Sequence, residues 1–441
     1  MIISGWGNYP RVETRWRTPQ DDADFTRRLK ADGPGIARGA GRAYGDAAIG
    51  SNTTLSTRHL DRMIAFDPAS AVLTVEAGVL LSDIIDVFLP RGFFPPVVPG
   101  TRFVTIGGMA AANVHGKNHH ISGGFGRHIQ SLTLITADGT QLVCTPTQNA
   151  QLFRATIGGM GLTGIIRDVT FRLIAVETGL IRQETIVLPN MDAVMGSFED
   201  SRNWTYSAAW IDGLARGASL GRSVLFRGEH ALRSELPPLT DPQMRALHPP
   251  RLSVPVYLPN VTLNRLSVRS FNALYLRYNR SHAGTHLVPL ASCFFPLDAI
   301  AHWNRIYGRQ GFLQYQCVIP RSKSRDALGE ILEIVATRGS PSFLAVLKLL
   351  GPDDAGMMAF PMDGYTLALD FPASEKSFSL CAELDDRVLA YGGRIYFAKD
   401  ARQSRDLVEA GYPNLAAFRE IRRQSGAFAR FGSLQSERLG L

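Results

Sequence analysis

Stretches in which apolar and polar residues alternate, or recur at helical spacing, divide the first part of the chain into short elements. Residues 72–78 alternate like a half-buried strand, and residues 131–144 predict a hairpin that turns at an Asp-Gly pair. Helical spacing at 80–92 and 149–159 predicts two helices that end at glycine or proline. Another helix is predicted to start at Thr18-Pro19, because acids fill the turn that follows.

The pattern changes near residue 177, where glycine-rich segments stop and aromatic residues become more frequent. Strands are predicted at 312–320, 342–351 and 365–372, with amphipathic helices at 324–339 and 377–393. These elements predict an antiparallel sheet flanked by helices, followed by an Arg-rich section that begins near 394. Gln314 and Gln316 would share one face of their strand, because side chains alternate along it. The predicted fold class is α+β.

Between these two regions lies a segment rich in proline. Seven prolines fall between residues 237 and 259, which predicts a loop without fixed secondary structure. Such a loop serves either as a lid over a site or as an ordinary linker, and the sequence leaves both readings open. Its apolar residues Val254, Val256, Tyr257 and Leu258 would also suit contact with a lipid surface.

Three glycine-rich loops stand out in the first part of the chain, at 38–48, 99–126 and 158–164. Glycines let a ligand approach the backbone, whose N–H groups can then face a phosphate or a planar ring. The first loop departs from the dinucleotide-binding fingerprint, because Tyr44 stands where its third glycine belongs and no helical pattern follows; a Rossmann fold is therefore disfavoured. The alternative is a set of surface turns, with His119 and His120 as scaffold.

The composition of the chain limits the kinds of ligand and partner that it is expected to bind. The 441 residues carry a net charge of +8 that is spread along the chain, which suits an anionic cofactor, substrate or lipid surface and gives no support for nucleic acid. Four separated cysteines form no C-x-x-C pair, so a metal site and a disulfide framework are not predicted. No secretory signal or membrane-spanning run is visible, which predicts a cytoplasmic protein, peripheral at the inner membrane face if it meets lipid.

Six strings carry a family resemblance: RGAGRAYGD, PGTRFVTIGG, HGKNHH, GGMGLTGII, WNRIYGRQGFLQYQ and GGRIYFAKDAR. They resemble the vanillyl-alcohol-oxidase / p-cresol-methylhydroxylase flavoprotein superfamily and, within it, the polyprenyl-phosphoribose 2′-oxidases. The resemblance implies an FAD-binding domain of two subdomains at 1–176. It also implies a substrate-binding domain at 177–393 over the flavin ring, and a C-terminal segment at 394–441 that returns to the FAD domain.

The resemblance also implies the cofactor contacts. Many relatives bond FAD covalently through a histidine in the first glycine loop, where this chain has Arg42, so FAD is expected to be non-covalent. The implied flavin contacts are Gly39, Ala40, Gly41, Arg42, Ala43, Tyr44, Gly45, Gly100, Thr105, Ile106, Gly107, Gly108, His115, Asn118, Ile166 and Tyr396.

Residues that act on the substrate are expected around the flavin ring. Lys399 would stabilise negative charge on the reduced flavin. His115 and Lys117 would bind or deprotonate the substrate hydroxyl, or bind pyrophosphate, and Tyr44 would wall the sugar site. A cysteine that the family places beside the flavin is Ala368 here, so inhibitors that bond to that sulfur are expected not to react. The expected substrate-binding residues are Trp210, Gln314, Gln316, Lys348 and Ala368.

The activity implied by the resemblance is oxidation of the 2′-hydroxyl of a polyprenyl-phosphoryl-β-D-ribose to a ketone. That reaction is the first half of an epimerisation to the arabinose donor for cell-envelope glycans. A separate NADH-dependent short-chain keto-reductase would complete it. Two other readings are an oxygen-using sugar-lactone or alditol oxidase of the same fold, and a flavoprotein-derived scaffold with no activity.

Overall fold

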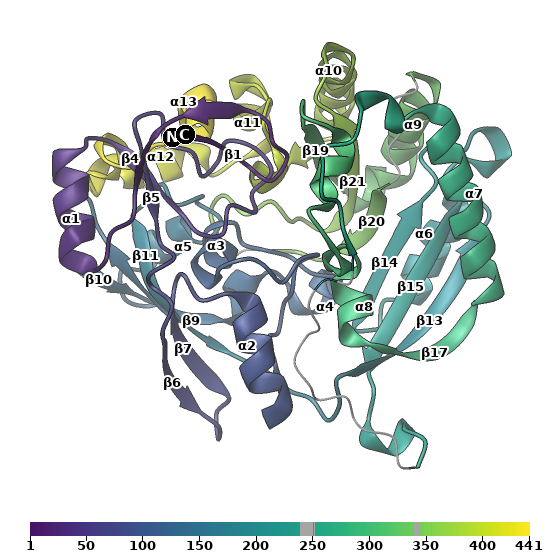
Figure 1. The fold of residues 1–441 in the computed structure, drawn as a ribbon, viewed down its shortest axis with the longest axis horizontal. Helices are drawn as coiled ribbons and strands as arrows, with labels where there is room; N and C mark the ends of the chain where they lie inside the picture. Colours follow the sequence, from purple (N-terminus) through teal and green to yellow (C-terminus); the bar gives the residue numbers. More distant parts are fainter. Residues whose placement is uncertain (239–249, 251, 339–343, 354) are drawn as a thin grey trace.

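The computed structural model describes residues 1–238, 250, 252–338, 344–353 and 355–441. Within these ranges the chain mixes helices with six sheets, so the predicted α+β class is confirmed. Two large sheets lie in opposite halves of the molecule, and the last helices of the chain return to the half built by the N-terminal residues (Figure 1). No helix among the described residues is both long and apolar enough to cross a membrane.

The N-terminal half contains a small parallel sheet and a larger antiparallel one. The parallel sheet has the order β3–β5–β4, and the antiparallel sheet has the order β10–β9–β11–β7–β6. Helices α2 and α3 pack with the larger sheet in one apolar core. The elements are β3 (Arg15–Arg17), β4 (Gly35–Arg38), β5 (Thr53–Ser56), β6 (Met63–Asp67), β7 (Val72–Glu76), α2 (Leu81–Phe88), α3 (Ile106–Ala111), β9 (Ile129–Ile135), β10 (Gln141–Cys144), α5 (Ala150–Thr156) and β11 (Ile165–Arg172).

Two helices start at other residues than predicted, because each begins directly after the polar residue that caps it. Helix α1 (Asp22–Ala31) begins after Asp21, whose carboxylate accepts a 2.7 Å hydrogen bond from the Asp24 N–H, and not at Thr18-Pro19. Helix α10 (Glu375–Ala390) begins after Ser374, two residues before the predicted start. The central glycine stretch, which the sequence analysis described as a loop, contains α3 and the short α4 (His119–Ser122).

The second large sheet has eight strands in the order β17–β13–β15–β14–β20–β21–β19–β22. Helices α6, α9 and α10 cover one of its faces and share an apolar core with it. The elements are β13 (Leu180–Leu188), α6 (Met191–Asp200), β14 (Tyr206–Ile211), β15 (Ser223–His230), β17 (Gly284–Pro289), β19 (Phe312–Pro320), α9 (Ser324–Arg338), β20 (Ala345–Leu350), β21 (Gly364–Pro372) and β22 (Arg394–Ile395).

Much of the proline-rich segment, at 239–249 and 251, lies outside the described residues. Its described end forms β16 (Leu252–Ser253), which pairs in parallel with β18 (Ile300–Ala301), so this part has regular structure that the sequence analysis did not predict. The next element, the 17-residue helix α7 (Arg265–Ser281), was also missed.

The C-terminal helices are α11 (Arg405–Gly411), α12 (Leu415–Gln424) and α13 (Leu434–Leu439). Helix α12 packs with α5, and Val408 of α11 shares an apolar cluster with Ile36. Phe431 pairs with Gly35 at the edge of the parallel sheet, and Arg438 forms a 2.8 Å ion pair with Asp46 in the first glycine loop. These helices lie in the N-terminal half of the molecule in Figure 1. The division at 176 and 393 stays a prediction.

Candidate functional site

The three glycine-rich loops meet at helix α3. A Cβ atom on Gly39 would overlap the Thr105 hydroxyl, so the first loop rests directly on the start of α3. Thr105 caps this helix by accepting a hydrogen bond from the Gly108 N–H. At the other end of α3, the N–H groups of Gly158 and Met160 in the third loop donate to its last carbonyls, at 3.1 and 2.8 Å.

A cavity of about 370 Å³ opens beside the first loop. Three buried polar atoms near the loops have no hydrogen-bond partner within the described chain: Arg42 Nε, His115 Nδ1 and Asn118 Oδ1. Glycine backbone, a cavity and unsatisfied polar atoms together fit an extended polar cofactor such as FAD. The cavity is lined by Trp16, Arg38, Gly39, Ala40, Arg42, Arg58, Leu80 and Phe103.

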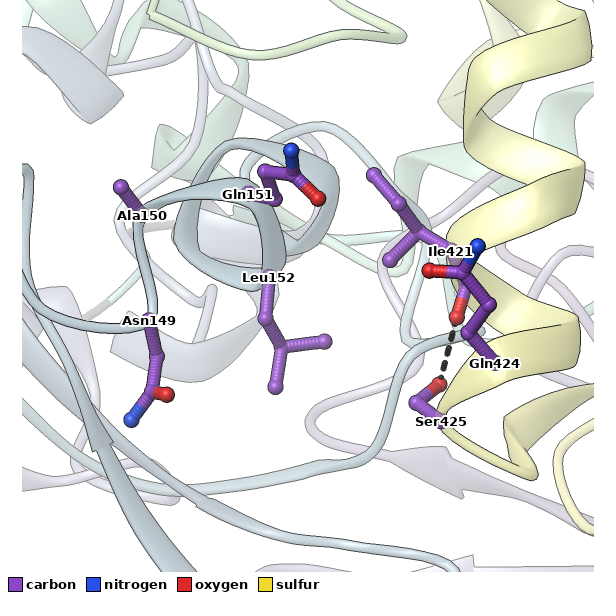
Figure 2. Close-up of a pocket in the computed structure, with 7 residues that line it drawn as sticks. All are labelled: Asn149, Ala150, Gln151, Leu152, Ile421, Gln424 and Ser425. Carbon is purple, nitrogen blue, oxygen red and sulfur yellow. Dashed lines mark hydrogen bonds between the residues drawn. The ribbon is translucent and has the colours of Figure 1, made fainter.

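A second pocket, of about 420 Å³, lies between α5 and α12. Figure 2 shows its lining, which runs from Asn149 to Leu152 on one side and from Ile421 to Ser425 on the other. None of the predicted site residues lines it, and it holds no titratable side chain. This pocket is therefore separate from the site at the glycine loops.

Strand register brings all five predicted substrate residues to one face of the eight-stranded sheet, opposite the face covered by α6, α9 and α10. Gln316, Ala368, Val346 and Trp210 pair across four neighbouring strands and so form one row. Gln314 pairs with Asp370 in an adjacent row, and Lys348 pairs with Thr366 on the other side. The expectation that the two glutamines share a face is confirmed.

A chain of hydrogen bonds links this face to the central glycine stretch. The Thr366 hydroxyl donates its only proton to the Cys317 carbonyl at 2.8 Å, so it must accept from the Gln316 amide nitrogen at 3.1 Å. The same nitrogen donates to His115 Nε2 at 2.9 Å. This assigns the proton of the neutral imidazole to Nδ1. Burial, then the nearby Lys348, holds the pKa of His115 well below its usual value.

A second polar cluster surrounds Asp370, which is fully buried. Its carboxylate accepts a 2.6 Å hydrogen bond from the Gln314 amide and a 3.2 Å bond from the Tyr307 hydroxyl. Lys399 lies nearby, with its ammonium 3.7 Å from the centroid of the Tyr44 ring. The cluster therefore joins a carboxylate, an ammonium and two phenols at the meeting of the two halves.

Burial shifts the charged groups of this cluster toward neutrality. It raises the pKa of Asp370 to about 7 and lowers the pKa of Lys399 to about 7, and in both cases it outweighs their mutual attraction. Burial, and then the field of Asp370, raises the pKa of Tyr44 well above its usual value, so the Tyr44 hydroxyl keeps its proton. Groups that titrate near neutral pH are suited to proton transfer.

The remaining predicted residues take less central positions. The Lys117 ammonium donates to the Cys293 carbonyl at 2.6 Å, and its proximity adds to burial in lowering the pKa of Lys348 to about 8. Trp210 is 6% exposed and packs against Tyr275 of α7, with ring centroids 4.8 Å apart. Tyr396 donates to the carbonyl of Ala112.

Of the other expected flavin contacts, Asn118 donates to the Pro96 carbonyl, Ile106 and Ile166 are buried in the N-terminal core, and a Cβ atom on Gly100 would meet open space. His119 donates from Nε2 to Asp353, because its Nδ1 accepts from the Gly351 N–H. No group of three or more His, Cys, Asp or Glu in the described ranges is arranged to hold a metal ion.

Sequence reasoning missed three residues of the site: Asp370, Tyr307 and Thr366. The signal for Asp370 was present, because it is the one carboxylate in an otherwise apolar strand segment, YTLALDFP. A buried strand accepts an acid only where a partner satisfies it. Tyr307 and Thr366 carried no comparable signal, since both residue types are common in strands and cores.

Fold and site together define an FAD-dependent oxidoreductase. A family profile described as an FAD binding domain matches residues 16–145. The chain is 36% identical to the decaprenylphosphoryl-beta-D-ribose oxidase of Mycolicibacterium smegmatis, over 100% of this chain and 97% of that protein. It therefore belongs to the flavoprotein family of that oxidase, within the vanillyl-alcohol-oxidase / p-cresol-methylhydroxylase superfamily, and the family resemblance seen in the sequence is confirmed.

Two other relatives show how far the similarity extends. An uncharacterized protein of Streptomyces coelicolor is 36% identical over 82% of this chain and 100% of its own length. L-gulonolactone oxidase of Mus musculus is 29% identical over 35% of this chain and 36% of its own length. Similarity to the lactone oxidase therefore covers only about a third of either protein.

Proposed function

We propose that the protein oxidises the 2′-hydroxyl of a polyprenyl-phosphoryl-β-D-ribose to the 2′-ketone, using FAD. The observation that carries the proposal is the full-length similarity to a decaprenylphosphoryl-beta-D-ribose oxidase. It is supported by the polar sheet face that meets the central glycine stretch through Gln316 and His115. The oxygen-using sugar-lactone or alditol oxidase remains the second candidate, and its relatives match only part of the chain.

The three glycine loops would hold the cofactor between the parallel and antiparallel sheets of the N-terminal half, which we take as the two FAD-binding subdomains. Arg42 stands in the first loop with its guanidinium 4.0 Å from the centroid of the Trp6 ring, and arginine forms no covalent bond to flavin, so the cofactor is held non-covalently. When bound, FAD supplies the hydride acceptor for oxidation of the sugar carbon.

Oxidation of a secondary alcohol also releases the hydroxyl proton, and we assign its acceptance to Asp370. The Nε2 lone pair of His115 is engaged by Gln316 and its Nδ1 carries hydrogen, so the resting histidine has no free site for a proton. Tyr44 already holds its proton. The Asp370 carboxylate is oriented by Gln314 and Tyr307, and the charge of Lys399 stabilises it.

Lys117 and Lys348 provide the charge expected for a phosphoryl substrate. Their ammonium groups are close enough that Lys117 lowers the pKa of Lys348. Two neighbouring cations are unfavourable without an anion between or beside them. A phosphoryl group would relieve this repulsion, whereas a neutral lactone or alditol would not.

This activity implies partners beyond the chain. A 2′-keto sugar requires a reductase to complete the epimerisation, for which an NADH-dependent short-chain enzyme is the proposed class. A polyprenyl substrate brings the protein to a membrane face, so peripheral attachment on the cytoplasmic side is part of the proposal.

A substrate panel tests the proposal. Holoenzyme is assayed with a short-chain polyprenyl-phosphoribose, the same lipid phosphate without sugar, L-gulono-lactone and a free alditol, with a redox dye as acceptor. Turnover of the phosphoribose alone is the expected result. Turnover of the lactone or alditol at an equal or higher kcat/KM would favour the second candidate.

A further inference from the structure

The exposed apolar side chains of this protein are concentrated in one region. The described residues include sixteen large hydrophobic side chains that are exposed, and eight of them lie in the 27 residues from Leu252 to Tyr278. Single exposed apolar residues are ordinary, whereas such a concentration marks a contact surface. We call this set the α7 surface: Leu252, Val256, Tyr257, Val261, Leu266, Phe271, Leu274 and Tyr278.

Helix α7 carries apolar residues on its outward face as well as on the face that packs against the sheet. Val268 and Leu276 face inward and are buried, as the contacts of α7 with β13 and β15 require. Phe271, Leu274 and Tyr278 follow the i, i+3, i+7 spacing of a second stripe, and their exposed fractions are 41%, 67% and 59%. An apolar stripe that faces outward serves a partner outside the fold.

The charges around the α7 surface indicate which kind of partner it binds. No aspartate or glutamate occurs from residue 242 to residue 297 of the sequence. Over the same range α7 carries four exposed arginines, Arg265, Arg269, Arg277 and Arg280. Exposed apolar side chains next to arginines, with no acid among them, match the interface of an anionic bilayer, where apolar groups insert and basic groups meet the phosphates.

The α7 surface is also continuous with the candidate site. Tyr257 lies 5.7 Å from the guanidinium of Arg305, which donates to the Pro255 carbonyl. Arg305 belongs to the same short helix as Tyr307, which donates to Asp370. One short helix therefore contacts the α7 surface through Arg305 and the Asp370 cluster through Tyr307.

We propose that the α7 surface docks the protein on an anionic phospholipid bilayer. This deepens the proposed function, on which it rests in one respect: a polyprenyl-linked sugar is presented to the enzyme from a bilayer. Docking by α7 would hold the mouth of the site against the lipid, so that the phosphosugar enters while its tail stays in the membrane.

Vesicle flotation tests the proposal. Holoenzyme is mixed with phosphatidylcholine vesicles with and without phosphatidylglycerol. The variant Leu274→Ser/Tyr278→Ser is compared with Ile64→Ser/Val143→Ser, which removes two apolar side chains of similar exposure from the N-terminal half. Wild type and control are expected to float with the anionic vesicles and to be released by salt, whereas the α7 variant loses roughly tenfold or more in partitioning.

Three results would overturn the proposal: no flotation of wild type, equal loss in both variants, or a solution dimer that only the α7 variant dissociates, which would make the surface a self-contact. Flavin bleaching by a water-soluble short-chain substrate, measured without vesicles, separates this test from that of the proposed function. Both variants should bleach like wild type, which also shows that they are folded.

Discussion

The Gln316 amide nitrogen donates to His115 Nε2 at 2.9 Å, and this contact decides what the histidine can do. Thr366 fixes the orientation of the Gln316 amide, because the threonine hydroxyl donates its proton to the Cys317 carbonyl and can only accept from Gln316. A histidine fixed in this way presents an N–H from Nδ1, so it can donate a hydrogen bond to a ligand. It cannot take a proton until Gln316 moves.

The first prediction concerns the state of His115. Histidine-labelled protein examined by nitrogen NMR should show the Nδ1–H tautomer for His115. The ring should protonate only at a pH well below the usual pKa of a histidine, because burial and Lys348 lower its pKa. Gln316→Met frees the Nε2 lone pair and should raise that pKa. Observation of an Nε2–H tautomer in wild type would contradict the assignment.

The second prediction concerns Asp370. A base must be deprotonated to act, and burial raises the pKa of this carboxyl to about 7, so kcat/KM should fall as the pH falls through about 7. Asp370→Asn keeps the shape of the side chain but removes the base, so kcat should fall on the order of 10²-fold or more. The decline of kcat/KM at low pH, which we call the acid limb of the pH profile, should disappear. Stopped-flow measurement of flavin bleaching against pH provides the test.

The matched control for Asp370 is Asp385, a partly buried carboxylate whose pKa is raised to about 6, chiefly by desolvation. It is 2.6 Å from Arg402, and it belongs to α10, on the opposite face of the sheet. Asp385→Asn should destabilise the fold but leave the acid limb in place. If kcat/KM of Asp370→Asn still declines at low pH, Asp370 is not the base.

The third prediction tests the contact between the first glycine loop and α3. Gly39→Ala would push Thr105 out of its capping position, at a cost of about 1–2 kcal/mol in unfolding free energy, and should lower the FAD content. Gly196→Ala is the control, because its Cβ meets no atom within 4 Å and α6 should gain about 0.5–1 kcal/mol. Thermal unfolding and flavin absorbance after gel filtration report both effects, and equal FAD retention would refute the contact.

The fourth prediction concerns the attachment of the flavin. Acid precipitation of the holoenzyme should leave the yellow colour in the supernatant, because Arg42 cannot bond to the ring. Arg42→Ala should weaken FAD binding, since the guanidinium lies beside the Trp6 ring and its buried Nε has no hydrogen-bond partner in the described chain. Flavin that stays with the precipitate would show that another side chain holds it covalently.

The sequence predicted those parts of the fold that depend on local patterns. Strands β7, β19 and β21 were predicted from apolar residues that alternate or run together. The glycine loops were recognised from their composition alone, because each glycine by itself favours a loop. Helix α7 was missed, because its apolar residues point in two directions and no single stripe stands out. Helix starts shifted where Asp21 and Ser374 act as caps.

The candidate site was predictable only where a motif carried it. HGKNHH and FAKDAR located His115, Lys117 and Lys399, whereas Asp370 depends on register: it joins the site because β21 pairs with β19 and places it opposite Gln314. Strand register and the hydrogen-bond partners of a buried acid depend on tertiary structure, so no short sequence motif predicts them. The tautomer of His115 likewise depends on Thr366, 251 residues away in the chain.

The most direct test of the account is anaerobic mixing of holoenzyme with a short-chain polyprenyl-phosphoribose and, separately, with its 2′-deoxy analogue. The flavin absorbance maximum is followed, and the sugar product is trapped with borodeuteride and weighed by mass spectrometry. We expect bleaching and one deuterium at C2′ with the ribose lipid, and no bleaching with the deoxy analogue. Bleaching by both lipids, or by neither, would contradict it.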